Sequence, residues 1–303
     1  MKKAKIAVLG LMGSSVFLRV SHFHRAGETL SATALHTEPG GKGCNQAVAA
    51  ARLGAEVCFV SCLGDDAAAD DCLAFMDGEG IVCHTERLKN TVSPCAFILT
   101  DSAGENRVTV YQGSAEHLSA AFVESCEGHI ASSDILLLNN ECPLEANLAA
   151  LDIALRRGVT VVLNPAPYIP LPQEYLAKFS IVTPNRHEAA MLCGLPADSD
   201  APDLLRGLLS MGIRCPVITL GSEGAVIPSG DKVELCSAIQ VTVRDTTGAG
   251  DCFNGALCCA LAEGLSLEDA VSFAVKAAAF SVSKKFVMPS LPRRRDLISN
   301  TVS

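Results

Sequence analysis

The sequence predicts an α/β fold, a doubly wound, mostly parallel sheet flanked by helices, with a small β-sheet lid. Apolar runs with strand character alternate with helical patterns along most of the 303 residues. This alternation is typical of parallel sheets with crossover helices. Two segments interrupt this alternation, because their sequences are typical of extended strands. Since no repeat, low-complexity tract or flexible linker divides the chain, we expect a single domain over residues 1–303.

The main sheet is predicted from the apolar runs and the helical patterns that follow them. "KIAVLG" at 5–10 is an example of a strand, and "PLEANLAALDIALRRG" at 143–158 is an example of a helix. The expected strands are 5–10, 56–64, 134–140, 159–165, 179–185 and 215–221. The expected helices are 43–54, 68–80, 143–158, 186–194 and 251–264.

The two breaks in this alternation predict the lid. The first comes directly after the first strand, where a crossover helix is due, and the second contains two strands around a turn rich in Asp, Ser, Gly and Asn. Both insertions follow strands of the main sheet. We therefore expect a lid made by residues of about 14–38 and 94–113, over the edge where open α/β sheets bind their ligands.

Residues 224–238 predict a further hairpin, with Ser229, Gly230 and Asp231 at its turn. It lies between the expected strand at 215–221 and another expected strand at 240–245. The hairpin fits a two-stranded flap beside a nucleotide site, and a plain connector is the alternative.

Charge and hydropathy exclude two classes of partner. The net charge is −9, from 24 basic and 33 acidic residues, and the only basic cluster is Arg293 to Arg295. Such a chain offers no nucleic-acid surface. No apolar segment approaches the roughly 18 uninterrupted residues of a membrane helix. The N-terminal apolar run has no small-residue cleavage site behind it, so we expect a cytoplasmic protein without a membrane partner.

The 14 cysteines are scattered through apolar stretches, and no C-x-x-C occurs. Disulfide frameworks belong to small secreted chains, and zinc sites need paired ligands at short spacing. We therefore expect buried free thiols in a reducing compartment. His22, His24 and His36 offer a second possible metal site, but histidines in such a stretch are more often surface polar residues.

The segment 245–255, "DTTGAGDCFNG", holds the strongest candidate for chemistry. Glycines ahead of a helix form a nest of backbone N–H groups that binds anions, yet Asp251 sits inside it. The simplest interpretation is that Asp251 caps the helix. Gly248 and Gly250, which free the backbone to approach a ligand, favour a proton acceptor instead. Cys252 as a nucleophile is a weaker alternative, because no histidine lies near it in sequence.

Two common phosphate-binding motifs do not fit. A Walker P-loop needs a hydroxyl after its lysine, and Gly43 follows Lys42. A dinucleotide fingerprint needs G-x-G-x-x-G, and the spacing from Gly250 to Gly255 is wrong for it.

The sequence resembles the ribokinase-like (PfkB) carbohydrate kinases over nearly its whole length. Five motifs in order carry the resemblance: "GGKGCNQAVAAARLGA" at 40–55, "NPAP" at 164–167, "TPNRHEA" at 183–189, "ITLGSEG" at 218–224 and "DTTGAGDCFNGAL" at 245–257. The last is the most specific. The resemblance implies ATP-dependent phosphorylation of a sugar, with Mg²⁺ and K⁺ as cofactors.

The resemblance also implies roles for residues at the nucleotide end. Asp251 matches the catalytic base, and Gly248, Ala249 and Gly250 match the anion hole at the transferred phosphoryl group. Asn185 and Glu188 match the N-x-x-E motif that orders Mg²⁺ and its waters. The residues matched to the rest of the nucleotide site are Thr219, Gly221, Gly224 and Val275.

On the sugar side, the resemblance implies polar contacts from two loops and apolar contacts from the lid. The matched sugar-binding residues are Gly13, Ser14, Ser15, Gly41, Lys42, Asn45, Ala96, Ile98, Val110 and Glu141, beside Asp251. The matched K⁺ site, mostly backbone carbonyls, consists of Asp245, Thr247, Ser281, Lys284, Phe286 and Ser290.

Three positions depart from the family pattern. Ser15 stands where an aspartate usually binds two sugar hydroxyls, Gly13 replaces an asparagine, and Phe286 replaces a glycine of the K⁺ site. Losing a charged acceptor costs on the order of 1.5–3 kcal/mol unless another group replaces it. Our hypothesis is therefore a differently hydroxylated or less polar sugar, or a nucleoside.

The sequence as a whole thus predicts an ATP-dependent kinase that acts on a primary hydroxyl of a small sugar. A nucleoside kinase of the same family is the first alternative, followed by a non-catalytic sugar-binding regulator and by a dehydrogenase on the same α/β plan. Exposed lid strands further predict a homodimer formed through the lid sheets.

Overall fold

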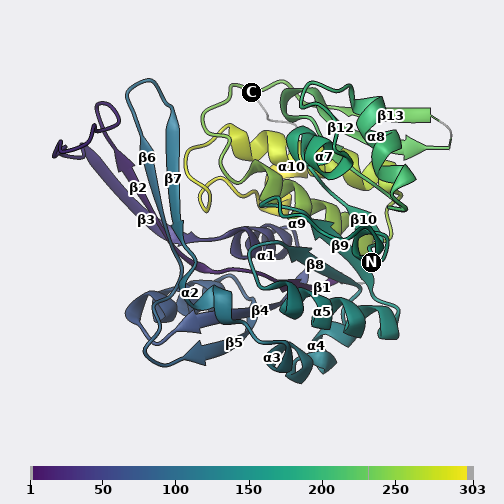
Figure 1. The fold of residues 1–303 in the computed structure, drawn as a ribbon, viewed down its shortest axis with the longest axis horizontal. Coiled ribbons are helices and arrows are strands. Elements are labelled where there is room, and N and C mark those ends of the chain that lie inside the picture. The colour runs from purple at the N-terminus through teal and green to yellow at the C-terminus, as the bar shows by residue number, and fades with distance from the viewer. Residues whose placement is uncertain (1–2, 231, 299–303) are drawn as a thin grey trace.

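A six-stranded sheet forms the centre of the computed structural model, which describes residues 3–230 and 232–298 (Figure 1). All of its neighbouring strands pair in parallel, so the predicted fold class is confirmed. Its strands, in spatial order, are β10 (Ile181–Val182), β9 (Thr160–Asn164), β8 (Ile135–Asn139), β1 (Lys5–Leu9), β4 (Glu56–Gly64) and β5 (Val82–Leu88).

Helices cover both faces of this sheet and separate two apolar cores. In Figure 1, α9 and α10 lie above the sheet and α3, α4 and α5 lie below it. The helices that bury residues in the first core are α1 (Lys42–Arg52), α2 (Ala67–Gly78), α9 (Ala249–Ala262), α10 (Leu267–Val282) and α11 (Arg294–Ile298). Those of the second core are α3 (Ala120–Ser125), α4 (Glu127–Ala131), α5 (Leu144–Arg157), α6 (Gln173–Leu176), α7 (Arg186–Cys193) and α8 (Ala201–Ser210).

No helix within the described residues is both long enough and apolar enough to cross a membrane.

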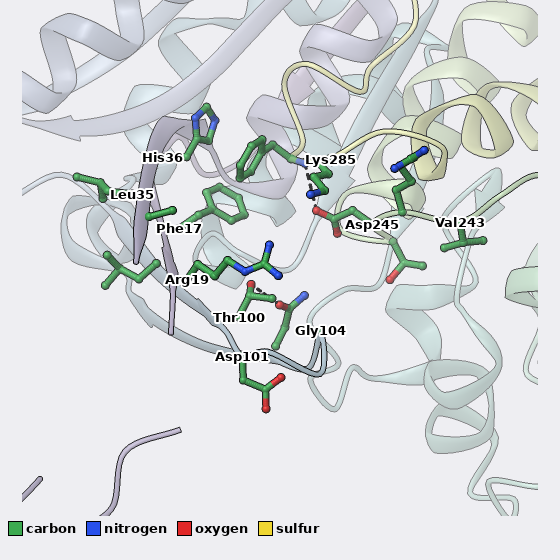
Figure 2. Close-up of a pocket in the computed structure, with 16 residues that line it drawn as sticks. Phe17, Arg19, Leu35, His36, Thr100, Asp101, Gly104, Val243, Asp245 and Lys285 are labelled. Carbon is green, nitrogen blue, oxygen red and sulfur yellow. Dashed lines mark hydrogen bonds between the residues drawn. The ribbon is translucent and has the colours of Figure 1, made fainter. Parts of the chain in front are cut away.

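A separate four-stranded sheet is built from the two segments that break the α/β alternation. Its strands, in spatial order, are β3 (Ala34–Gly40), β2 (Gly13–Arg19), β6 (Cys95–Thr100) and β7 (Asn106–Tyr111). The sheet projects away from the body of the molecule (Figure 1). A cavity of about 640 Å³, lined by Phe17, Arg19, Asp101 and Asp245 among others, lies between this sheet and the loop before α9 (Figure 2).

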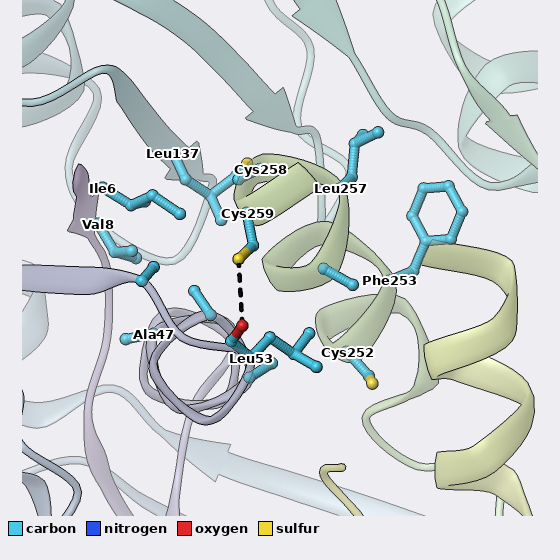
Figure 3. Packing of buried hydrophobic residues seen from close by; sticks show 14 of the residues in the cluster. Ile6, Val8, Ala47, Leu53, Leu137, Cys252, Phe253, Leu257, Cys258 and Cys259 are labelled. Atoms are coloured by element: carbon cyan, nitrogen blue, oxygen red, sulfur yellow. Dashed lines mark hydrogen bonds between the residues drawn. The ribbon is translucent and has the colours of Figure 1, made fainter. Parts of the chain in front are cut away.

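The first core brings α9 against α1 and the central sheet. Figure 3 shows Cys259 of α9 facing Leu53, the residue that follows α1, and the Cys259 thiol donates to the Leu53 carbonyl at 3.6 Å. Gly255 permits this contact, because a Cβ atom there would lie 2.6 Å from the Gln46 carbonyl oxygen and 2.7 Å from the Ala49 Cβ. Close packing of the two helices fixes where the amino-terminal turn of α9 lies.

Three sequence predictions about strands need correction. β5 was not predicted, because its polar residues His84, Glu86 and Arg87 interrupt the apolar run that would indicate a strand. An edge strand tolerates such residues. The strand expected at 240–245 is a loop, whose Arg244 and Asp245 amides donate to the Val282 carbonyl at the end of α10 instead of to a strand. The strand expected at 215–221 shortens to β11 (Ile218–Thr219).

β11 belongs to a third, antiparallel sheet rather than to the central one. It pairs with β12 (Gly224–Ser229), which pairs with β13 (Lys232–Ser237), and these last two strands form the predicted hairpin. Asp231, predicted at the turn of that hairpin, lies outside the described residues. Two short 3-10 helices, Gly113–His117 and Gly221–Glu223, complete the described elements.

The contact between α1 and α9 can be tested by adding one methyl group. We expect Gly255→Ala to lower the free energy of unfolding by about 1–3 kcal/mol, because its Cβ would press on backbone atoms of α1. Gly78→Ala is the control: it lies in α2, where an added Cβ would meet no heavy atom within 4 Å, and we expect no loss of stability. Urea unfolding measures both, and a Gly255→Ala protein as stable as the Gly78→Ala protein would contradict this account of the packing.

Candidate active site

Asp251 is buried in the first turn of α9, at the carboxyl edge of the central sheet. The helix begins after Gly248, whose φ of 77° lies in the left-handed region that favours glycine. A Cβ atom at Gly248 would also lie 2.6 Å from Val287 Cγ1. The tight turn thus directs the amide groups of the helix start and the Asp251 carboxylate toward the same space.

Two amide side chains of α1 hold the Asp251 carboxylate. Asn45 Nδ2 donates to Oδ2 at 2.8 Å, and Gln46 Nε2 donates to Oδ1 at 3.1 Å. Burial raises the pKa of Asp251, while the positive charge of Lys42 and these two hydrogen bonds lower it. The pKa of Lys42 is in turn raised, chiefly by Asp251. Lys42 is therefore a cation that stabilises the ionised carboxylate.

A polar network behind Asp251 joins the ends of two strands to α9. Gln46 Nε2 also donates to Asn164 Oδ1 at 3.1 Å, and Asn164 Nδ2 donates to the Thr183 carbonyl. The Thr183 hydroxyl donates to Asn254 Oδ1 at 2.6 Å, and Asn254 Nδ2 donates to the Gly250 carbonyl. These side chains hold the first turn of α9 in place against the ends of β9 and β10.

Gln46 and Asn139 belong to this network, and the sequence analysis gave neither a role. Asn139 Nδ2 lies 3.4 Å from Gln46 Oε1, and its carbonyl accepts a hydrogen bond from Asn147. The signal in the sequence was the asparagine that ends each of the apolar strands β8 and β9, since polar residues at the carboxyl ends of parallel strands face the ligand-binding edge.

A cavity of about 330 Å³ lies on one side of Asp251, between the central sheet and the four-stranded sheet. All the predicted sugar-binding residues line it: Gly13, Ser14, Ser15, Gly41, Lys42, Asn45, Ala96, Ile98, Val110, Glu141 and Asp251. The buried Asn45 Oδ1 has no hydrogen-bond partner in the described part of the chain. A ligand hydroxyl in this cavity would satisfy it.

Two further cavities lie on the other side of Asp251. The nearer, of about 230 Å³, is lined by Asn185, Glu188 and the glycine turn of α9. The farther, of about 430 Å³, is lined by Thr219, Gly221, Gly224 and Val275. Gly250 lines both of them, and Lys42 and Asp251 line both the nearer cavity and the sugar-side cavity. The three cavities therefore follow one another, with Asp251 at a junction.

Glu38 is a charged residue of the sugar-side cavity that the sequence analysis missed. It pairs with Ser15 across strands β2 and β3, so the two side chains lie on one face of the sheet. Glu38 is buried, and its Oε1 accepts hydrogen bonds from the Val287 and Met288 amides at 2.8 and 3.3 Å. A carboxylate thus lies next to Ser15, the position where the family's aspartate is lacking.

Two of the predicted K⁺-site residues, Thr247 and Phe286, contact Asp245. Its Oδ1 accepts from the Thr247 amide at 2.9 Å and its Oδ2 from the Phe286 amide at 3.1 Å. Phe286 adopts a φ of 63°, so it takes the left-handed conformation that a glycine adopts easily, at a cost of roughly 1–2 kcal/mol. Its ring stacks on His36, 3.9 Å between centroids. Ser281 and Ser290 are buried, and their hydroxyls donate to carbonyls of their own turns, while Lys284 lies over the Phe280 ring.

Two glutamates near Asp251 carry raised pKa values. Burial and the negative charge of Asp251 raise the pKa of Glu141 to about 7, although its Oε2 accepts a 2.7 Å hydrogen bond from the Lys42 amide. Burial likewise raises the pKa of Glu188. Asn185 and Glu188 form a capping box at the start of α7, and one Glu188 oxygen accepts from the Asn185 amide at 2.9 Å.

Comparison with known proteins decides the family. Residues 3–294 match the description "pfkB family carbohydrate kinase". The chain belongs to the pfkB carbohydrate kinases. It is 38% identical to a ribokinase of Haemophilus influenzae, over 97% of each chain.

Solved ribokinase structures share the fold. The ribokinase of Thermotoga maritima is 32% identical with a TM-score of 0.89, and the alignment covers 98% of each chain. An Arabidopsis thaliana ribokinase, whose structure contains ribose and ATP, is 29% identical with a TM-score of 0.88 over 98% of each chain. The predictions of the family and of an ATP-dependent carbohydrate kinase are confirmed. They leave no place for the dehydrogenase alternative.

The raised pKa of Glu141 predicts a dependence of stability on pH. A carboxyl whose folded pKa, about 7, exceeds its ordinary value of 4.5 favours folding when protonated. This stability is fully present below pH 4.5 and is lost as the pH rises through 7. We expect Glu141→Gln to abolish a loss of up to about 3 kcal/mol across this window. Urea unfolding at several pH values measures the difference.

The matched control is Glu145→Gln, which removes the same charge from an exposed position four residues along the chain. The free energy of unfolding of the Glu145→Gln protein should change with pH as it does in the unmodified protein. Parallel stability curves for Glu141→Gln and the unmodified protein between pH 4.5 and 7 would show that Glu141 ionises as an ordinary carboxyl.

Proposed function

We propose that the protein transfers the γ-phosphoryl group of ATP to a primary hydroxyl of a small, ribose-like sugar, with Asp251 as the base. The observation that carries this proposal is the position of Asp251, which lines both the sugar-side cavity and the cavity of the Asn185 and Glu188 side chains. An acceptor on one side and a triphosphate on the other would both reach the same carboxylate.

The reaction follows from this arrangement. Asp251 takes the proton of the sugar hydroxyl as its oxygen attacks the γ-phosphorus, and the bond to the β–γ bridging oxygen breaks to release ADP. The amides of Ala249 and Gly250, at the amino-terminal end of α9, donate to the phosphoryl oxygens on which negative charge builds. Lys42 lines both cavities and adds a positive charge at the site of transfer.

Two cations complete the proposal. Mg²⁺ would neutralise charge on the phosphates, and Asn185 and Glu188, which present oxygen donors in the nearer cavity, suit its preference for oxygen ligands. K⁺ would bind among Asp245 and the backbone of Thr247, Ser281, Lys284, Phe286 and Ser290. The left-handed φ of Phe286 supports it, since the side chain does not prevent the conformation expected there.

The four-stranded sheet is proposed to act as a lid and to pair in a cytoplasmic homodimer. Leu35, Phe97 and Tyr111, which lie on one face of this sheet, have 68%, 43% and 54% of their surface exposed. Apolar side chains exposed at this level on one thin sheet favour pairing with a second copy.

Glu38 supports a ribose-like acceptor despite the change at Ser15. Its charge lies on the strand next to Ser15 and faces the same cavity. We propose that Glu38 supplies the negative potential that an aspartate at position 15 would supply, with the Ser15 hydroxyl as the direct contact. The sugar would then bind to the neutral Ser15 hydroxyl, which can both donate and accept a hydrogen bond, with the Glu38 carboxylate next to it.

The base is tested by Asp251→Asn. The amide keeps the size of the side chain but accepts no proton, so we expect kcat to fall at least about a thousandfold while ATP still binds. ADP release is measured over a panel of pentoses, deoxypentoses, hexoses, polyols and nucleosides. A rate near that of the unmodified enzyme would refute the role of Asp251, and preferential use of nucleosides would favour the nucleoside kinase alternative.

The sugar contact is tested by moving the charge between strands. We expect Ser15→Asp alone to weaken ribose binding, since two carboxylates would then lie opposite each other, and Glu38→Gln alone to raise the KM for ribose about tenfold. The double variant should recover affinity relative to either single variant. Additive losses in the double variant would show that Glu38 serves only its own hydrogen-bond partners, which are His36 and the Val287 and Met288 amides.

A further inference from the structure

Three potential metal ligands meet far from Asp251, in a cluster that no step of the kinase reaction uses. Cys58, His84 and His129 each place one ligand atom within 4.8 Å of the other two. Cys58 and His84 are each the third residue of their parallel strands, β4 and β5. The cluster therefore lies near the amino ends of the strands, opposite the carboxyl edge that bears the active site.

The sheet register explains why the first two side chains meet. Cys58 pairs with Val82 and Val60 pairs with His84, so Cys58 and His84 share one face of the sheet, one repeat apart. Helix α4 covers this face and adds His129, whose ring centroid lies 3.8 Å from that of His84 at an interplanar angle of 32°. Three separate elements thus contribute one ligand each.

The His84 ring has a buried atom with nothing to bind. Its Nε2 makes no hydrogen bond within the described residues, and an unsatisfied buried polar atom destabilises the folded protein. In the neutral ring, one of the two nitrogens carries a lone pair that can bind a metal. A neutral imidazole without a hydrogen-bond partner is suited to bind a metal.

We propose that Cys58, His84 and His129 bind Zn²⁺ or a chemically similar borderline divalent ion. One thiolate and two imidazoles match zinc, whereas Mg²⁺ and Ca²⁺ require oxygen ligands that this cluster lacks. A tetrahedral zinc centre holds its N and S ligands about 3.3–3.8 Å apart, so small side-chain rotations suffice. His129 is exposed, which leaves room for water as the fourth ligand.

The ion would tie α4 to the edge strand β5 and would act on stability rather than on catalysis. Among the described strands, β5 is the last of the central sheet on its side. Helix α4 contains only five residues, Glu127–Ala131, too few to be stable without tertiary contacts. A bond from the His129 ring through the metal to β4 and β5 would fix both elements.

The test is a titration of the full-length, reduced protein with Co²⁺, followed by displacement with Zn²⁺. We expect one equivalent to bind with a thiolate-to-cobalt charge-transfer band in the near ultraviolet. His129→Gln removes an exposed ligand without disturbing the core, and we expect its affinity to fall at least about tenfold. Cys58→Ser should abolish the band. Zn²⁺ should raise the melting temperature of the unmodified protein and not that of the Cys58→Ser protein, because binding stabilises the state that binds.

Two control variants separate this site from the other cysteines and histidines. Cys126→Ser changes a buried thiol whose hydrogen bond is to Ser125, and His117→Gln changes an exposed histidine. Both should bind Co²⁺ like the unmodified protein. Equal binding by His129→Gln and the unmodified protein, a charge-transfer band that survives Cys58→Ser, or no stoichiometric binding at all would overturn the proposal.

Discussion

The architecture depends on placing one negative charge, that of Asp251, in a buried position without neutralising it. Removing a carboxylate from water is costly unless paired groups and hydrogen bonds replace the water. Here α1 supplies all of them: Lys42 provides the charge, and Asn45 and Gln46 provide the hydrogen bonds. This requires α1 and α9 to lie in close contact, which Gly255 permits. The ionisation of Asp251 therefore depends on how closely α1 and α9 pack in the core.

The same dependence extends to the four-stranded sheet. Glu38 of β3 accepts hydrogen bonds from the amides after Phe286, and Phe286 donates to Asp245 and stacks on His36. These contacts connect the sheet, the loop before α9 and the segment after α10. A change at any one of the three would alter the wall of the sugar-side cavity as well as the geometry of the α9 start.

Much of this could be predicted from the sequence, for identifiable reasons. The apolar strands and the helices between them follow periodicities that a single sequence displays, and the glycines around Asp251 mark the turn before α9. Contacts between residues that are distant in the sequence and are brought together by strand register or helix packing could not be predicted. Glu38 meets Ser15 only through the β2–β3 pairing, and β5 is concealed by polar residues that an edge strand tolerates. The loop at 240–245 has a strand-like composition, but the end of α10 takes two of its amides.

The cysteines of α9 have a further consequence for how the protein withstands chemical attack. Cys252, Cys258 and Cys259 are fully buried, and burial raises the pKa of the Cys252 and Cys259 thiols to about 12. Oxidants and alkylating agents react with accessible thiolates, and these groups are neither accessible nor ionised at neutral pH. These three cysteines are therefore protected from peroxide and electrophiles as long as the protein stays folded. Their modification would indicate that the protein has unfolded.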